Sequence, residues 1–293
     1  MRSAWAWRTA CSAAWWCADR VRADLHLHST ASDGSLSPGA VAVTARAAGL
    51  DLIALCDHDT VAGVAAATAA AGPDLRVIPA LEVSSTLEGR ELHLLGYGVD
   101  PADPAIVRYG ETAAAARAER MRGMIEQLAR RNVHVSWDDV LNSADVPPQC
   151  LGRPHLARAL QVRGYVRTVA DAFDRFIGND GPAYVHLELF EPADALSLIH
   201  AAGGLAVWAH PRLEVFDRRV RELRALGLDG VECYRPRLTP TEVQYFEAAA
   251  RDLGLVRTGG SDWHGSWHGP MGDFAVAERE IGDFLDALQR QPR

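Results

Sequence analysis

The chain has 293 residues, and its 30 basic side chains against 38 acidic ones give a formal net charge of -8. This length suits one large domain or two smaller ones with a sizeable buried core. The sequence has no uninterrupted run of about 18 apolar residues, so we expect no membrane-spanning helix. The acidic balance excludes a general nucleic-acid coat, and we expect no stable binding to duplex nucleic acid. It leaves room for a pocket that holds one short phosphorylated substrate.

All 30 basic residues are Arg, and the chain contains no Lys. This excludes a P-loop lysine, a Schiff-base lysine and a carbamylated lysine that bridges two metals. The 5 cysteines are odd in number and scattered, and they form no CxxC motif. We therefore expect neither a disulfide framework nor a zinc knuckle, and the pattern favours a reducing, cytoplasmic setting.

Residues 1–20 differ from the rest of the chain, with several Trp and no clear hydrophobic periodicity. We expect them to form an N-terminal extension outside the fold. A signal peptide is the weaker alternative, because no continuous apolar segment follows the charges. A misplaced translation start is a sharper hypothesis, since Val21 opens the first clear strand.

From Val21 onward, short β-rich runs alternate with Ala-rich helical runs. This alternation predicts parallel βα units, and seven strands with flanking helices favour a closed or distorted βα barrel over an open sheet. The expected strands are 21–27, 51–57, 76–84, 91–99, 205–210, 230–235 and 256–262. The expected helices are 37–48, 60–71, 193–202, 217–226, 240–253 and 278–290.

The alternation stops after the fourth strand, and the following segment has a purely helical pattern. Ser136 and Asp139 have the spacing of a helix N-terminal capping box. Since the segment lies between the fourth and fifth strands, it would cover the same barrel rim as the βα loops. We expect residues 21–102 and 193–293 to form the barrel domain, and residues 103–192 to form a helical insertion that caps the active site, with helices at 104–131, 137–142, 154–163 and 168–177.

Two histidines mark the end of the first strand. His26 and His28 stand two residues apart, so both side chains face the same way and can chelate one metal ion. Asp24 shares that face and could orient a ligand. Alone, the pair is a weak signal, since ordinary polar residues also occur at strand ends.

Further imidazole and carboxylate groups fall at or just after the ends of the other strands, apart from His93 in mid-strand. Barrel enzymes carry their active sites on this rim. A set of nitrogen and oxygen ligands suits Zn²⁺, Mn²⁺ or Fe²⁺, and a set this large suits two or three ions that activate water and neutralise a phosphoryl group. A rim of capping side chains is the alternative. The expected metal ligands are His26, His28, Asp33, His58, Glu82, His93, His210, Asp262 and His264.

The motifs HLHSTASDG, CDHDT, HLLGYG, AHP and GSDWHG, with the strand that carries Glu82, together resemble the PHP (polymerase and histidinol phosphatase) superfamily. The resemblance covers about residues 21–99 and 197–270. The insertion, with Gly152-Arg153-Pro154-His155, is similar to that of small bacterial PHP phosphoesterases. Those enzymes remove the 3′-phosphate from nucleoside 3′,5′-bisphosphates, and some trim short 5′-phosphorylated RNA. The resemblance implies an α/β fold, a distorted (β/α)7 TIM-like barrel with an inserted small helical domain, that holds two or three Mn²⁺, Fe²⁺ or Zn²⁺ ions.

The resemblance also implies how the ligands divide among the ions. Glu82 would bridge the first two ions. The implied sets are His26, His28 and Asp262 for the first ion, His93 and His210 for the second, and Asp33, His58 and His264 for the third.

The resemblance makes Asp262 and His155 the expected catalytic residues, with His155 either hydrogen-bonding a phosphate or protonating the leaving oxygen. Arg153 would clamp a phosphate bidentately, as guanidinium geometry allows. Ordinary helix-start chemistry is the alternative for the Arg153-Pro154-His155 stretch. Arg235, at the end of the sixth strand, is the remaining expected substrate contact.

Other polar and aromatic residues have structural interpretations. We expect the four histidines away from the motifs to be structural or exposed, and two tryptophans beside ligands to pack the barrel or its rim. We expect three arginines on the long insertion helix to form a solvated face, with a phosphate or RNA contact as the minority interpretation. These residues are His134, His186, His200 and His268; Trp208 and Trp263; and Arg117, Arg120 and Arg122.

The sequence therefore predicts a metal-dependent phosphoesterase that acts on a nucleotide phosphomonoester. The candidate substrates are a nucleoside 3′,5′-bisphosphate, a short RNA 5′ end and a cyclic phosphodiester. A histidinol-phosphatase-like enzyme is disfavoured by the insertion and by Asp33, where that branch usually has His. A non-catalytic metal-binding PHP module is disfavoured by the complete ligand set. Amidohydrolase chemistry is disfavoured by the lack of Lys. The oligomeric state stays open.

Overall fold

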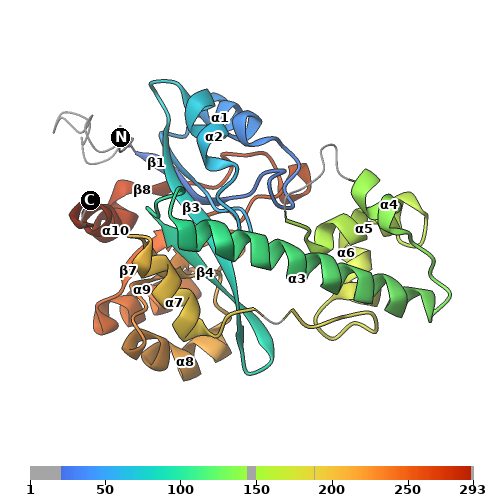
Figure 1. The fold of residues 1–293 in the computed structure, drawn as a ribbon. Helices are drawn as coiled ribbons and strands as arrows, with labels where there is room; N and C mark the ends of the chain where they lie inside the picture. Colours follow the sequence, from blue (N-terminus) through green and yellow to red (C-terminus); the bar gives the residue numbers. More distant parts are fainter. Residues whose placement is uncertain (1–20, 144–149, 188, 292–293) are drawn as a thin grey trace.

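The structure is a computed structural model that describes residues 21–143, 150–187 and 189–291, so the expected extension 1–20 lies outside the described residues (Figure 1). One sheet runs through the barrel in the order β7-β6-β5-β4-β3-β2-β1-β8. Its strands are β1 (Arg22–Leu27), β2 (Leu52–Leu55), β3 (Arg76–Leu87), β4 (Arg90–Tyr97), β5 (Leu205–Trp208), β6 (Gly230–Tyr234), β7 (Val256–Gly259) and β8 (Val276–Ala277).

The segment after β7 almost closes the sheet into a barrel. Trp263 donates its backbone N–H to the carbonyl of His26 at 3.3 Å and accepts one from His28 at 3.0 Å. These bonds join the end of β7 to the end of β1. The predicted distorted barrel is confirmed.

Two strand relationships differ from the prediction. β4 is antiparallel to both β3 and β5, because a two-residue turn joins β3 to β4 without a crossover helix. Both turn residues, Glu88 and Gly89, have positive φ angles (53° and 72°), which is typical of a tight hairpin. β8 was not expected. It is only two residues long and pairs antiparallel with β1.

The helices follow the predicted order. Prolines in the first turn and side-chain caps define many of their starts, and the Ser136–Asp139 capping box is confirmed. In the described residues, no helix is long and apolar enough to cross a membrane. The barrel helices are α1 (Pro38–Ala47), α2 (Val64–Ala71), α7 (Pro192–Ala201), α8 (Leu213–Ala225), α9 (Pro240–Leu253) and α10 (Glu278–Arg290). Between β4 and α7 lie α3 (Pro104–Ala129), α4 (Trp137–Asn142), α5 (Arg153–Val162), α6 (Val169–Ala172) and a π-helical turn (Phe173–Ile177).

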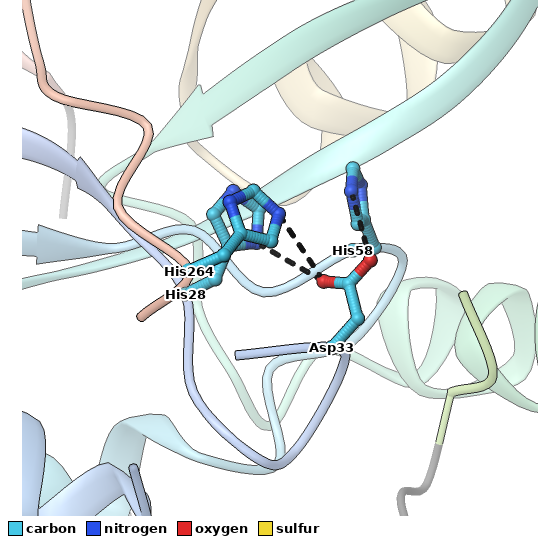
Figure 2. A group of neighbouring side chains, drawn as sticks. All are labelled: His28, Asp33, His58 and His264. Atoms are coloured by element: carbon cyan, nitrogen blue, oxygen red, sulfur yellow. Dashed lines mark ion pairs between the residues drawn. The ribbon is translucent and has the colours of Figure 1, made fainter. Parts of the chain in front are cut away.

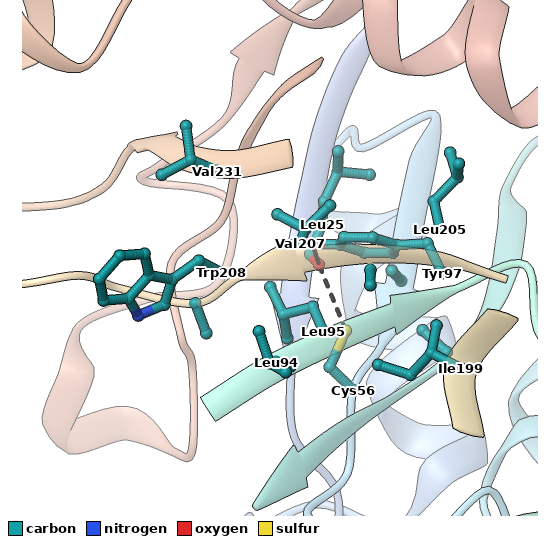
Figure 3. Close-up of a cluster of buried hydrophobic side chains, with 14 of the residues drawn as sticks. Leu25, Cys56, Leu94, Leu95, Tyr97, Ile199, Leu205, Val207, Trp208 and Val231 are labelled. Carbon is teal, nitrogen blue, oxygen red and sulfur yellow. Dashed lines mark hydrogen bonds between the residues drawn. The ribbon is translucent and has the colours of Figure 1, made fainter. Parts of the chain in front are cut away.

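The barrel and the helical insertion have separate buried clusters. Figure 3 shows part of the barrel cluster, in which the buried Tyr97 hydroxyl donates to the carbonyl of Leu25 at 2.9 Å. The insertion cluster includes Met124 and Leu156. The long helix α3 extends from the barrel to the insertion and contributes to both clusters (Figure 1). The assignment of residues 103–192 as a cap over the active site stays a prediction.

Candidate active site

The nine expected ligands come together at one end of the barrel. Most of them follow the carboxyl ends of β1, β2, β5 and β7, as expected for a barrel rim, and Glu82 lies in the middle of the long strand β3, where it pairs with His58. His93 reaches the same place from the opposite direction. Because β4 is antiparallel, its first half lies beside the end of β3, where His93 pairs with Ser84. The mid-strand position of His93 is therefore explained by the strand direction.

Glu82 is the centre of the cluster. Its Oε1 lies 2.9 Å from both His93 Nδ1 and His210 Nε2. Its Oε2 lies 3.0 Å from His58 Nδ1, 3.5 Å from His26 Nε2 and 3.4 Å from His28 Nε2. The two oxygens of one buried carboxylate thus face two different sets of imidazoles, the arrangement required of a bridging ligand.

Asp33 lies at the centre of a second group, which it forms with three histidines (Figure 2). Its Oδ1 lies 3.3 Å from His264 Nε2 and 3.9 Å from His28 Nδ1, and its Oδ2 lies 3.7 Å from His58 Nε2. The rings of His28 and His264 stack with their centroids 4.0 Å apart. His28 therefore faces both this group and the group around Glu82.

Asp262 completes the cluster near β1. Its Oδ1 lies 3.3 Å from His26 Nε2 and 3.2 Å from His28 Nε2. Together with Glu82, these residues form one group whose ligand atoms all lie within 4.8 Å of one another. The structure brings together all nine expected ligands. How they divide among individual ions stays a prediction.

The chemistry of these side chains fits divalent cations. In the residues that the structure describes, the buried His26 Nε2, His28 Nε2, Asp33 Oδ1, Glu82 Oε2 and Asp262 Oδ1 have no hydrogen-bond partner. Orphaned buried polar atoms are costly unless something binds them. Burial raises the pKa values of the three carboxyl groups, but the surrounding histidines outweigh it and hold them well below their usual ranges. The site therefore offers charged carboxylate oxygens beside imidazole nitrogens.

Two residues with unusual backbone angles and one glycine help to fix the positions of the expected ligands. His210 and Asp262 have positive φ angles of 32° and 54°, a conformation that non-glycine residues adopt rarely and at functional sites. Gly260 passes so close to β1 that an added Cβ would lie 2.2 Å from the Cβ of His26 and 2.6 Å from its backbone nitrogen. Any side chain at residue 260 would displace the strand that carries His26.

Glu232 and Asp57 support the expected ligands, although no sequence motif singled out either residue for this role. Glu232 Oε1 lies 3.0 Å from His26 Nδ1, and its Oε2 accepts the backbone N–H of His210 at 2.7 Å. Asp57 accepts hydrogen bonds from Ser29 and Ser32 in the loop after His28. A carboxylate inside the apolar strand β6 was the available signal for Glu232, because a buried charge needs a partner.

Asp24 acts on the backbone instead of on a ligand side chain. Its Oδ1 accepts the N–H of Ser261 at 2.9 Å and that of His26 at 3.3 Å. The expectation that Asp24 orients a ligand is thus met only indirectly. It fixes the backbone beside Asp262, while Glu232 holds the ring of His26.

The expected substrate residues come from two parts of the chain, since Arg153 and His155 begin α5 and Arg235 follows β6. Arg153 donates to Glu91 at 3.1 Å and to Asn179 at 2.7 Å. His155 is buried, and its Nδ1 lies 3.0 Å from the backbone nitrogen and 3.2 Å from the carbonyl oxygen of Gly152. Arg235 donates to the carbonyl of Pro211 at 2.9 Å. Their roles towards substrate stay predictions.

Two arginines of α3 correct the expectation of a solvated face. Arg117 and Arg120 are buried, because each faces a carboxylate of the barrel: Asp59 for Arg117 and Glu91 for Arg120. Arg122 is exposed, as expected, with 56% of its side-chain surface accessible. The helical pattern alone could not show which arginines face these carboxylates.

The remaining expectations for structural residues hold. His134, His200 and His268 are exposed, and His186 is partly exposed. Trp208 and Trp263 are both buried and belong to hydrophobic clusters.

No family model matches the chain. The chain is 35% identical over 271 residues to a 5′-3′ exoribonuclease of Haemophilus influenzae, an alignment that covers 90% of this chain and 94% of the relative. It is 33% identical to a 3′,5′-nucleoside bisphosphate phosphatase of Chromobacterium violaceum, covering 84% and 88%. It is 31% identical to a phosphoribosyl 1,2-cyclic phosphate 1,2-diphosphodiesterase of Eggerthella lenta, covering 83% and 94%.

Two solved structures are similar over nearly their whole length. One, named an amidohydrolase from Chromobacterium violaceum with bound sulfate and no metal, has a TM-score of 0.82 at 30% identity, covering 91% of this chain and 95% of that one. The other, named a metal-dependent phosphoesterase of Bifidobacterium adolescentis, has a TM-score of 0.80 at 29% identity, covering 92% and 96%. With the barrel, the ligand cluster and these relatives together, the chain belongs to the PHP superfamily of metal-dependent phosphoesterases.

Proposed function

We propose that the enzyme removes the 3′-phosphate from nucleoside 3′,5′-bisphosphates, for example converting adenosine 3′,5′-bisphosphate to AMP, with two or three divalent ions (Mn²⁺, Fe²⁺ or Zn²⁺). The observation that carries the proposal is the convergence of nine nitrogen- and oxygen-bearing side chains on one rim, several with orphaned ligand atoms. The ions would be held by His26, His28, Asp33, His58, Glu82, His93, His210, Asp262 and His264. Bound there, they supply Lewis-acid activation of water and neutralise phosphoryl charge.

His155 is suited to hydrogen-bond a phosphate oxygen. Its Nδ1 lies 3.0 Å from the backbone nitrogen of Gly152 and 3.2 Å from the carbonyl oxygen of the same residue, so Nε2 is the ring nitrogen that neither backbone contact uses. Burial lowers the pKa of His155 to about 4, so the ring is neutral at neutral pH. A ring that is neutral at neutral pH favours substrate binding over delivery of a proton to the leaving oxygen.

Arg153 is suited to a second, unreacting phosphate. Glu91 binds both Arg153 and Arg120, so one carboxylate is shared between two guanidinium groups. A phosphate that approaches this pair would meet excess positive charge and planar donors suited to bidentate contact. A bisphosphate, which carries a phosphate away from the reacting one, would use such a contact.

The relatives support this substrate class, with two further candidates. The similarity to a bisphosphate phosphatase and to an exoribonuclease favours a nucleotide or a short 5′-phosphorylated RNA end as the partner. The similarity to a cyclic-phosphate diphosphodiesterase favours a cyclic phosphodiester as the second candidate. A lysine-bridged metal pair is excluded for this chain because it has no Lys. Its buried free cysteines (Cys56, Cys150 and Cys233) favour a reducing, cytoplasmic setting.

The test measures phosphate release from adenosine 3′,5′-bisphosphate by Mn²⁺-loaded protein, with 5′-AMP, a 5′-phosphorylated oligoribonucleotide and a cyclic phosphate assayed in parallel. We expect one phosphate per bisphosphate and AMP as the product. The His26→Ala/His28→Ala variant should be inactive. A matched His134→Ala/His200→Ala variant, which changes two exposed histidines, should keep its activity. Metal-loaded protein that releases no phosphate from the bisphosphate would refute the proposed substrate.

A further inference from the structure

Asp59 follows the expected ligand His58 and is held in an unusual conformation. It is fully buried, and its φ angle is 55°. Both carboxylate oxygens are engaged. Oδ1 accepts hydrogen bonds from the Ser84 N–H at 2.6 Å and from the Tyr109 hydroxyl, and Oδ2 accepts from the Ser84 hydroxyl at 2.9 Å and from Arg117 Nε at 2.6 Å. A strained backbone of this kind persists only where its surroundings fix it.

Arg117 is the cationic partner of Asp59, and it lies 58 residues later in the chain. It lies on α3, the helix that leads from the barrel into the insertion (Figure 1). Besides Asp59, its guanidinium donates to the Ser84 hydroxyl at 2.7 Å and to the carbonyl of Leu151 at 3.5 Å. One planar fork therefore joins three separate segments.

Each of these segments carries an expected ligand or contacts one. Asp59 follows His58 directly and donates its N–H to the carbonyl of Glu82 at 2.8 Å. Ser84 lies two residues after Glu82 on β3. Leu151 precedes Gly152, where an added Cβ would lie 2.3 Å from Asp33 Oδ2. A shift of Arg117 would therefore displace segments that carry or contact three expected ligands: His58, Glu82 and Asp33.

The Arg117–Asp59 pair is also costly to bury. The side chains are 6% and 0% exposed. An apolar pair of similar volume often serves stability equally well, so a buried ion pair is weak support for a purely stabilising role. A guanidinium group, however, fixes the orientation of the groups that accept its hydrogen bonds, and an apolar pair would not do so.

We propose that Arg117 is a positioning residue through which the helical insertion holds His58, and with it the group His28, Asp33, His58 and His264, in the geometry that binds a divalent cation. This inference rests on the metal centre of the proposed function. It does not depend on which phosphate ester is the substrate.

The first test is Arg117→Lys in the full chain, with Arg122→Lys as the matched control on an exposed site of the same helix. Each protein is stripped with a chelator and reloaded with Mn²⁺. Bound ions per chain are counted by mass spectrometry, and affinity is measured by calorimetry. Lysine keeps the charge, but its compact ammonium lacks the planar fork whose Nε, Nη1 and Nη2 bind Asp59, Leu151 and Ser84. We expect Arg117→Lys to lose one Mn²⁺ per chain or to bind the weakest ion at least tenfold less tightly, with the circular dichroism of the metal-free protein unchanged. Arg122→Lys should match the wild type.

The second variant, Arg117→Met/Asp59→Asn, is used in case Arg117→Lys misfolds. It removes both charges of the pair, so no unpaired charge stays buried. We expect it to fold and to show the same loss of metal. The inference is overturned if either folded variant binds as many Mn²⁺ ions as the wild type with Kd values within twofold. A wild-type chain that binds no Mn²⁺ would overturn the metal centre and this inference together. A chain that binds Mn²⁺ but leaves the bisphosphate intact would contradict only the proposed substrate.

Discussion

Glu232 lies behind His26, with its Oε1 3.0 Å from the imidazole Nδ1. This contact fixes the ring tautomer, because Nδ1 must carry the proton that the carboxylate accepts, and it leaves Nε2 facing Glu82 and Asp262. Histidines that bind metals usually have a partner of this kind on the second ring nitrogen. The pair therefore orients Nε2 of His26 towards the two carboxylates, as its expected role as a ligand requires.

We expect Glu232→Gln to weaken Mn²⁺ binding about 10–100-fold, the usual cost of losing such a partner. Glutamine has only one acceptor oxygen, so it cannot serve both the His26 ring and the backbone N–H of His210. Calorimetry of the reloaded protein measures the change. Glu247→Gln, at a carboxylate that accepts from Tyr234 away from the cluster, is the matched control. Equal affinities in the two variants would show that Glu232 is not needed.

Gly260→Ala should abolish metal binding or folding. The new methyl group would lie 2.6 Å from the backbone nitrogen of His26, and a backbone atom cannot move aside cheaply. The same substitution at Gly282 should have the opposite effect, since that glycine lies in α10 with no atom within 4 Å of an added Cβ. Alanine there should raise stability by up to about 1 kcal/mol through helix propensity. Thermal unfolding of the two glycine variants tests both predictions. Equal melting temperatures for the two variants would contradict them.

The exposed pair of His200 and Asp229 predicts a small dependence of stability on pH. His200 Nε2 donates a hydrogen bond to the Asp229 carboxylate at 2.8 Å, and this bond raises the pKa of His200. A raised folded pKa means that this contribution is complete below the unfolded pKa and is lost as pH rises through the folded value. His200→Gln should therefore lower the melting temperature at pH 5.5 more than at pH 9. His134→Gln, at another exposed histidine, is the control. A deficit that is the same at both pH values would exclude this ion pair as its source.

Removing the divalent ions should destabilise the whole protein. Ions that bind only the folded chain stabilise it by about 2.7 kcal/mol at a hundred times Kd. We expect a chelator to lower the melting temperature and to abolish phosphate release, and added Mn²⁺ to restore both. An unchanged melting temperature would mean that the carboxylate and imidazole cluster is stable without a cation.

Much of the fold and the site could be predicted from local sequence patterns. The helices at 137–142 and 278–290 have the predicted bounds, because a capping box and a strong apolar stripe define them within the helix itself. The convergence of the expected ligands was also predictable, since strand–helix alternation brings the carboxyl ends of parallel strands to one rim.

Properties set by distant contacts could not be predicted in this way. The reversed direction of β4 depends on a two-residue turn, and β8 is too short to give a pattern. Arg117 and Arg120 lie close to the exposed Arg122 in sequence, but they are buried beside Asp59 and Glu91, which are distant in sequence. Glu232 serves a histidine that lies 206 residues earlier in the chain.

Helix α3 contributes residues to two hydrophobic clusters, so the unfolding of one cluster should be coupled to the unfolding of the other. Ile106, Tyr109 and Ala113 belong to the barrel cluster, while Met121, Met124 and Leu128 belong to the insertion cluster. A continuous helix cannot leave one cluster intact while its other half melts freely, so the two clusters should be lost together. We expect a single cooperative transition in denaturant, with the amides of α3 among the most slowly exchanging in the chain.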